Sequence, residues 1–455
     1  MLTIERAFLD ILITYIIMSK KSLVEEAKRV LIGNFQKKGF TIPSKNLYPF
    51  QWKWDSGFIA IGLAHFNIEK AKKEIENLLN AQWENGFIPH IVFHTKNDSY
   101  FPGADFHKSS LNPKSSKHIE TSGITQPPVL GFVLEKLYNM ADNKIDILKF
   151  IKSQINKVYK SHRYFYSKRD INNEGLVYIY HNWESGTDNS PVWDDIWKTM
   201  NPPRYKFERK DTNHVDSSQR PTNREYDHYI DLIELAKRFN YDDNKIAKHS
   251  PFLVQDPLFN SILIRSNECL IRLYEILGGN EEKIRYLKSK NEKSLTNINK
   301  KLYNPSIGAY SHFNLRNGKK IPLICSSSFS PLFCGAPDLD MAQKLKNTLM
   351  KKFGKHDYYL CSSFDPEGKK HNQKKYWRGP VWINLNWILY HGLKRYQYEE
   401  IAKRIKNDSL ELVDKFGFYE YFNPSKKTSK ESNKGYGGEN FSWTAALTID
   451  FLSEK

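Results

Sequence analysis

Apolar residues recur at intervals of three and four along almost all of this 455-residue chain. The pattern runs from SLVEEAKRVLIGNFQ through GPVWINLNWILYHGLKRY to SWTAALTIDFL, and with a segment near 55–66 it predicts about twelve helices. Strand patterns are few and short, such as GLVYIY and IGAYSHF, and no Pro-, Gly- or Ser-rich linker divides the chain. These features predict one all-α domain of paired helices over residues 21–455.

The first 20 residues stand apart from this domain. The run ILITYIIM is shorter than the roughly 20 apolar residues of a membrane span. Glu5 and Asp10 precede it and no small-residue cleavage site follows it, unlike in a signal peptide. We interpret residues 1–20 as an N-terminal extension, either an extra helix or sequence upstream of a start at Met18. We expect a cytoplasmic protein without a membrane partner.

Charge and cysteine usage narrow the function further. The formal net charge is +18, but lysine is spread along the whole chain, which favours a compositional bias over a nucleic-acid interface. A mild attraction for anionic ligands is compatible with it. Four cysteines form no CxxC pair and no Cys/His cluster with zinc spacing. We therefore expect buried free thiols, no metal ion and no cofactor, and the sequence does not indicate an oligomeric state.

Six polar segments rich in tryptophan or tyrosine lie at predicted helix starts. They are YPFQWKWDSGF, NAQWENGFIPHIVF, ETSGITQPP, HNWESGTDNSP, YWRGPVW and GYGGENFSW. One such segment is typical of a capped helix start with an aromatic staple. Six of them at one end of a helical barrel would converge on one cavity, where helix N-termini present free N–H groups. We favour a shared pocket.

The ordered set FQWKWDSGF, QWENGFIPH, SGITQPP, WESGTDNSP, YWRGPVWINLNW, EYFNP and FSWTAAL resembles glycoside hydrolase family 63. It is most similar to the compact mannosylglycerate/glucosylglycerate hydrolase branch, and more distantly similar to the trehalases of family 37. The resemblance runs from about residue 45 to the C-terminus, nine-tenths of the chain. It implies an (α/α)6 barrel whose loops at one end form a sugar pocket. It also implies an inverting α-glycosidase whose substrate is a small-molecule glycoside.

The resemblance implies two catalytic carboxyls. The general acid of the ESG-x-D motif falls on Asp188, and two glutamates, Glu420 and Glu439, compete for the general base. Their order matches Glu420 to the trehalase base and Glu439 to its supporting residue, although the long basic segment before GYGG puts the spacing in doubt. Inversion needs a protonated acid and an ionised base roughly 6.5–9.5 Å apart. The tryptophan-rich turn would raise the pKa of Asp188 by desolvation, and Glu184 would raise it further if the two carboxyls approach each other.

Simpler interpretations of these acids stay open. Asp188 suits an Asx turn or a helix N-cap before Pro191, and Glu420 could be a solvated acid beside tyrosines. Asp194 and Asp195 are expected to cap the helix that follows.

Sugar binding requires carboxylates and amides for the hydroxyls and an aromatic platform for the C–H face of the ring. Arg378 could equally bind sugar or form a structural ion pair, and Trp382 and Trp387 are expected to pack in the core. By the resemblance, the sugar subsite is formed by Trp52, Trp54, Asp55, Gln126, Trp183, Glu184, Gly186, Tyr376, Trp377 and Arg378, with Glu439 in support.

The aglycone is less constrained. A glycerate carboxylate needs a cation and hydroxyls, and QRPTNREYDHY offers Arg220, Arg224 and Tyr226. This segment belongs to a long polar loop, 199–225, which could be a lid or a plain surface loop. We expect mannosylglycerate or glucosylglycerate as the substrate. The alternatives are a trehalase-type α-glucosidase acting on di- or oligosaccharides and a non-catalytic carbohydrate-binding protein.

Overall fold

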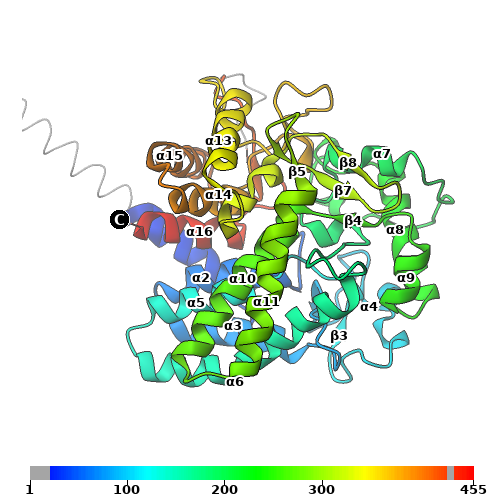
Figure 1. Cartoon of the computed structure of the whole chain (residues 1–455), viewed down its shortest axis with the longest axis vertical. Coiled ribbons are helices and arrows are strands. Elements are labelled where there is room, and N and C mark those ends of the chain that lie inside the picture. The colour runs from blue at the N-terminus through cyan, green and yellow to red at the C-terminus, as the bar shows by residue number, and fades with distance from the viewer. Residues whose placement is uncertain (1–20, 428–434, 455) are drawn as a thin grey trace, which may run out of the picture.

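The computed structural model describes residues 21–427 and 435–454. Within these ranges six helices form a closed inner ring, in which each helix contacts the next and the last contacts the first. Figure 1 shows this closure where the red C-terminal helix lies against the blue N-terminal region. In chain order the ring is α2 (Lys53–Ala64), α5 (Leu130–Met140), α10 (Pro257–Ile276), α12 (Pro331–Cys334), α14 (Ile383–Arg395) and α16 (Ser442–Ser453). The predicted (α/α)6 barrel is confirmed.

Outer helices cover the ring. They are the helical residues 21–34, α3 (Ile68–Asn80), α6 (Lys144–Tyr164), α11 (Glu281–Asn297), α13 (Leu339–Phe353) and α15 (Glu399–Phe416). Helix α3 packs on α2, α6 on α5, α11 on α10 and α15 on α14. Each of these outer helices buries one apolar stripe, whereas α2 and α16 are buried almost all round. Close packing inside the ring depends on Gly62, where an added Cβ would lie 2.3 Å from the Cα of Ala446.

The inner helices begin at the same end of the barrel. Trp54 and Asp55 lie in the first turn of α2, Trp443 lies in the first turn of α16, and Tyr376 and Trp377 precede α14. All five residues line one cavity. The predicted convergence of the aromatic segments on a shared pocket is therefore observed.

The strands are short and brace loops at this end. Strands β1 (Gln51–Trp52), β2 (Ile91–Phe93) and β3 (Glu120–Thr121) form an antiparallel sheet in the order β1-β2-β3. A second sheet has the order β4-β7-β8, formed by Val254–Gln255, His312–Asn314 and Lys319–Ile321. Two further pairs are β5 (Tyr303–Asn304) with β6 (Ala309–Tyr310), and β9 (Tyr421–Phe422) with β10 (Gly435–Tyr436).

The strand expected for GLVYIY, residues 175–180, is wrong. This segment makes one isolated bridge, between Ile179 and Val254. Its other N–H groups are taken elsewhere, since Val177 donates to the Asn260 side chain at 2.8 Å and Tyr180 to the Glu184 carboxylate at 2.9 Å. A sheet neighbour therefore finds no free row of donors on this segment.

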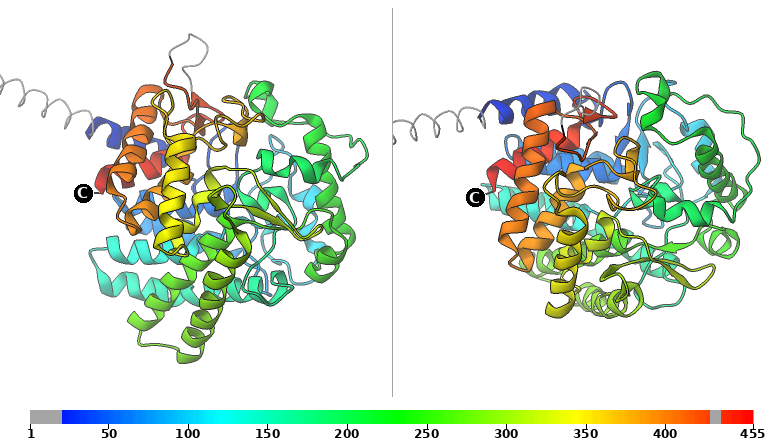
Figure 2. Two further views of the ribbon diagram at one scale, coloured as in Figure 1. Left: turned by 45° about the horizontal axis from the view of Figure 1, so that its top comes forward. Right: turned by 90° about the horizontal axis from the view of Figure 1, so that it is seen from above.

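A long segment between α6 and α10 forms one side of the molecule, drawn in green in Figure 2. It carries α7 (Asp194–Trp197), α8 (Asn223–Arg238) and α9 (Asp243–His249). Upstream of it, α4 (Ala104–His107) is a single short turn. An aromatic cluster including Trp193, Trp197 and Tyr229 holds the segment together.

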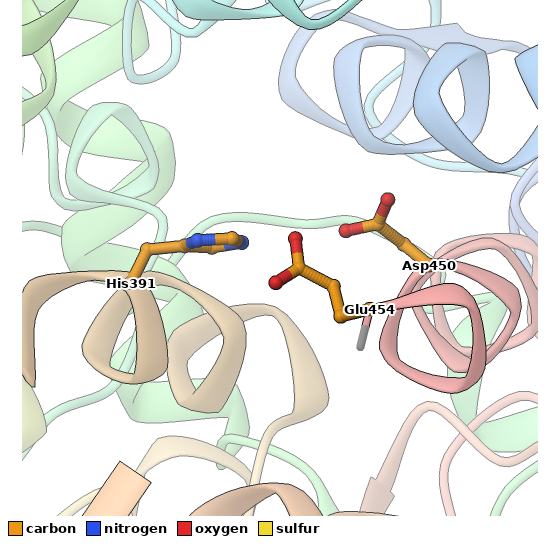
Figure 3. A group of neighbouring side chains, drawn as sticks. All are labelled: His391, Asp450 and Glu454. Atoms are coloured by element: carbon orange, nitrogen blue, oxygen red, sulfur yellow. The ribbon is translucent and has the colours of Figure 1, made fainter. Parts of the chain in front are cut away.

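The opposite end of the barrel holds an ion-pair network. His391, Asp450 and Glu454 lie together there (Figure 3). The Lys136 ammonium contacts the carboxylates of both Asp450 and Glu454 at 3.0 Å. Trp387 also donates to Asp450 at 2.8 Å, so the hydrogen-bond donors of these carboxylates come from the protein itself.

No helix within the described ranges is long and apolar enough to cross a bilayer. Residues 1–20, interpreted above as an extension, lie outside the described residues.

Candidate active site

A cavity opens where the inner helices begin. Its wall combines two acids expected to be catalytic with a large aromatic surface. Eleven of the fifteen expected site residues line it: Trp52, Trp54, Asp55, Gln126, Trp183, Gly186, Asp188, Tyr226, Tyr376, Trp377 and Glu420.

Asp188 enters the cavity from a tight turn. Gly186 begins this turn with φ of 75°, and a Cβ added there would lie 2.5 Å from the Trp54 ring, so the position requires glycine. Asn182 fixes the turn by donating to the backbone carbonyl of Asp188 at 2.7 Å. Burial raises the pKa of Asp188 to about 7, against the opposing charge of Arg220.

Glu420 faces the same cavity from the residue before β9. It is 1% exposed and accepts hydrogen bonds from the Tyr48 hydroxyl at 2.8 Å and from the Gly438 N–H at 3.1 Å. The Arg220 guanidinium lies 3.6 Å away. Burial raises the pKa of Glu420, while Arg220 and the Tyr48 hydroxyl act in the opposite direction. A Cβ at Gly437, the residue after Tyr436, would lie 2.2 Å from this carboxylate, so a side chain at this position would clash with Glu420.

Tyr376 and Arg220 connect the two acids. The Tyr376 hydroxyl interacts with both Asp188 and Glu420, and lies 3.3 Å from the Tyr48 hydroxyl. Tyr376 has a positive φ of 43°, an uncommon conformation for a tyrosine that the surrounding packing maintains. The Arg220 guanidinium lies 4.1 Å from the centre of its ring. Protonation at one acid is therefore coupled to the charge on the other.

One wall of the cavity is aromatic. Trp54 packs edge-on against Trp443 at 5.5 Å, and Trp377 stacks on Trp382 at 3.5 Å. Trp382 in turn lies behind the wall in the core, as expected. Among these rings, burial raises the pKa of Asp55 well above its usual range. The Gln126 side chain is oriented by accepting the Trp54 N–H at 3.2 Å.

Four expected site residues lie outside the cavity, and three of them, Arg378, Glu184 and Arg224, form ion pairs. Arg378 binds Asp194 through both terminal nitrogens, each at 2.8 Å, so of the two interpretations of Arg378 the structure has the structural ion pair. Asp194 is thereby occupied and does not cap α7, whose first N–H groups have no side-chain acceptor. Glu184 is fully buried behind the wall and pairs with Arg169 at 3.0 Å.

Arg224 and Glu439 point away from the cavity. Arg224 donates to the carbonyl of Pro202 at 2.9 Å and lies near Asp227 at the edge of α8. Glu439 is exposed and accepts from the Tyr419 hydroxyl at 3.1 Å, on a surface cleft separate from the cavity. The register of β9 and β10 explains this difference, because Gly437 and Gly438 pack against Glu420 and carry Glu439 past it.

Several lining residues are not among the expected site residues. Tyr48, His90, Phe441 and Trp443 lie inside the aromatic segments, so the motifs indicate their neighbourhood. Tyr100 and Asp211 come from segments without a pattern. The others are Pro43, Phe101, Pro221 and Arg220, of which the sequence offers Arg220 only for the aglycone.

The polar loop 199–225 forms part of the wall. Arg220 donates to Asp211 at 3.0 Å and to the Tyr48 hydroxyl at 3.0 Å, and its exposed fraction is 4%. Lys374 binds Asp216 at 2.7 Å, which fastens the loop to the segment before α14. The loop is therefore built into the cavity and is more than a plain surface connection.

Comparison with known sequences agrees with this architecture. The profile of the mannosylglycerate hydrolase MGH1-like glycoside hydrolase domain matches residues 48–444. The chain belongs to this family. Mannosylglycerate hydrolase from Rubrobacter radiotolerans is 37% identical over 446 residues, covering 95% of this chain and 97% of that protein. Glucosylglycerate hydrolase from Mycolicibacterium hassiacum is 32% identical over 418 residues, covering 89% and 92%.

Solved structures show the same relationship. The family 63 mannosylglycerate hydrolase of Thermus thermophilus, crystallised with Tris and D-glycerate, is 36% identical, with a TM-score of 0.87 over 95% of this chain and all of that one. Neutral trehalase from Saccharomyces cerevisiae shares the fold at 14% identity, with a TM-score of 0.54 over 91% of this chain and 73% of the trehalase. This protein is a glycoside hydrolase, and the expected family is confirmed.

Proposed function

We propose that the protein hydrolyses mannosylglycerate with inversion at the anomeric carbon, Asp188 acting as general acid and Glu420 as general base. The observation that carries this proposal is that both carboxyls face one aromatic cavity and are coupled through Tyr376 and Arg220. Asp188, with a pKa raised to about 7, holds a proton near neutrality and donates it to the glycosidic oxygen. Glu420 takes a proton from the water that attacks the opposite face of the sugar.

The two roles follow from unequal surroundings. Glu420 has a hydroxyl, a backbone N–H and a guanidinium around it, and all three favour the ionised form. Asp188 forms no ion pair among the described residues, so its burial is less compensated. This inequality is the pattern by which paired carboxyls divide into base and acid. Glu439, exposed and outside the cavity, is not proposed for catalysis.

The aglycone side of the cavity supports a carboxylate. Nη1 of Arg220 is buried without a hydrogen-bond partner, although it lies 3.6 Å from Glu420. An aglycone carboxylate would supply the missing acceptor, with the Tyr226 hydroxyl in the same wall. We assign this role to Arg220 in place of Arg224. Mannose is preferred over glucose because identity is 37% to the mannosylglycerate hydrolase and 32% to the glucosylglycerate hydrolase.

A hydrolysis panel followed by proton NMR tests the proposal. Mannosylglycerate, glucosylglycerate, trehalose and kojibiose are incubated with wild type, Asp188→Asn and the surface control Asp195→Asn, whose side chain is 65% exposed. We expect the β-anomer first from mannosylglycerate, loss of at least about 10³-fold in kcat for Asp188→Asn, and wild-type rates for the control. First release of the α-anomer would overturn the mechanism. Preference for glucosylglycerate or trehalose would overturn the substrate.

A further inference from the structure

Four buried ionisable side chains lie directly behind the cavity wall. Lys53, Arg169, Glu184 and Asp243 are each at most 7% exposed, and none of them lines the cavity. Arg169 joins the two carboxylates, with Nη1 3.0 Å from Glu184 and Nε bound to Asp243. The formal charges of the four cancel. A neutral, fully satisfied cluster of this kind holds its members in one arrangement.

The Glu184 carboxylate fastens two segments of the wall at once. Its Oε1 accepts the Thr125 N–H at 3.2 Å, and its Oε2 accepts the Tyr180 N–H at 2.9 Å. Thr125 directly precedes Gln126, which lines the cavity. Tyr180 enters the turn that ends at Asp188. The relative position of a sugar-contacting amide and the proton donor is thus set through one carboxylate.

Lys53 attaches a third segment to the same cluster. Its ammonium donates to the Thr125 hydroxyl at 2.8 Å and to the Gln126 carbonyl at 2.7 Å. The next two residues, Trp54 and Asp55, line the cavity. Burial lowers the pKa of Lys53, and the Glu184 charge acts against that shift. Three separate wall segments therefore meet on one buried cluster.

We propose that Glu184 is a positioning residue that holds the Asp188 turn and the Gln126 loop in their catalytic arrangement. It does so because its carboxylate reaches two backbone N–H groups and Arg169 at the same time. A negative charge at this position without those contacts is not sufficient to hold the two segments. The inference rests on the proposed role of Asp188 as proton donor. Because a displacement of about 1 Å at a reacting group costs about 10²-fold in rate, loss of the Glu184 contacts has a measurable catalytic effect.

Glu184→Asp tests whether the reach of the side chain matters, because it keeps the charge but shortens the side chain by one methylene. We expect kcat on mannosylglycerate to fall about 10- to 100-fold. On the α-glycosyl fluoride of the same sugar the loss in kcat should shrink to within about 3-fold, because fluoride leaves as an anion without protonation by Asp188. Glu411→Asp, on the surface of α15, is the matched control and should retain wild-type rates.

Two outcomes would overturn the inference. The first is an unchanged kcat for Glu184→Asp on mannosylglycerate; the second is an equal loss on both substrates, which indicates general damage to the fold. If Glu184→Asp does not fold, the double variant Glu184→Gln/Lys53→Met decides, because it keeps the cluster neutral and should show the same substrate-dependent loss. Inactivity of the wild type on every glycerate glycoside would instead count against the proposed function.

Discussion

Replacement of Arg220 by methionine should move the pH range of activity upward. The Arg220 guanidinium lies 3.6 Å from Glu420 and opposes the raised pKa of both Glu420 and Asp188. At 3.6 Å and an effective dielectric constant of about 20, Coulomb's law gives about 4.6 kcal/mol, equivalent to about 3 pKa units. The Tyr48 and Gly438 donors remain in the variant, so we expect the pKa of Glu420 to rise by less than this Coulomb energy alone implies.

The sign follows from the roles proposed for the two acids. Glu420 must be ionised, so a higher pKa moves the acidic limb of kcat/KM to higher pH. Asp188 must be protonated, so a higher pKa moves the basic limb, expected near pH 7 in the wild type, in the same direction. The whole bell-shaped profile is displaced upward, independently of any loss in absolute rate from weaker aglycone binding.

The assay is the pH dependence of kcat/KM, which reports pKa values of the free enzyme. Arg220→Lys is the control, because it retains a positive charge and should leave both limbs within about 1 unit of wild type. Melting temperatures establish that both variants are folded. Limbs of Arg220→Met that stay within about 0.3 unit of wild type, or that move to lower pH, would refute the coupling between this arginine and the two carboxyls.

Two further predictions concern the choice between Glu420 and Glu439 as general base and the ion pair between Asp194 and Arg378. Glu420→Gln should lower kcat by about 10³-fold or more, whereas Glu439→Gln should stay within about 3-fold of wild type, because only Glu420 lies in the cavity; the reverse order in steady-state assays would make Glu439 the base. Asp194→Asn should lower the free energy of unfolding by about 1–3 kcal/mol, because it removes the charge from the bidentate pair with Arg378; unchanged urea denaturation would contradict this.

The barrel could be predicted because its information is local. The outer helices carry their own stripes of apolar residues, and the aromatic segments mark the N-terminal ends of inner helices. The failed strand at residues 175–180 shows where local information ends. Its run of β-branched and aromatic residues is typical of a strand, but Asn260 and Glu184 accept hydrogen bonds from N–H groups that a sheet would use.

The site depends on partners that are distant in the chain. Tyr48 and Glu420 are 372 positions apart, and Arg378 and Asp194 are 184 apart. No periodicity links such residues, so the motifs identify the cavity without identifying which side chains enter it. The loop 199–225 is the extreme case, because it has no repeating pattern and yet supplies Arg220 and Asp211 to the wall.

The acids of residues 181–195 show what decides such roles. Glu184, Asp194 and Asp195 each lie within 3.0 Å of an arginine or lysine nitrogen, and each therefore serves as an ion-pair partner. Asp188 has no such cation among the described residues and is surrounded by protein, which is why its pKa rises to about 7. Pairing favours the ionised form of a carboxyl, whereas burial without pairing favours the protonated form. In this segment the lack of a direct ion-pair partner, more than the motif itself, supports Asp188 as the proposed proton donor.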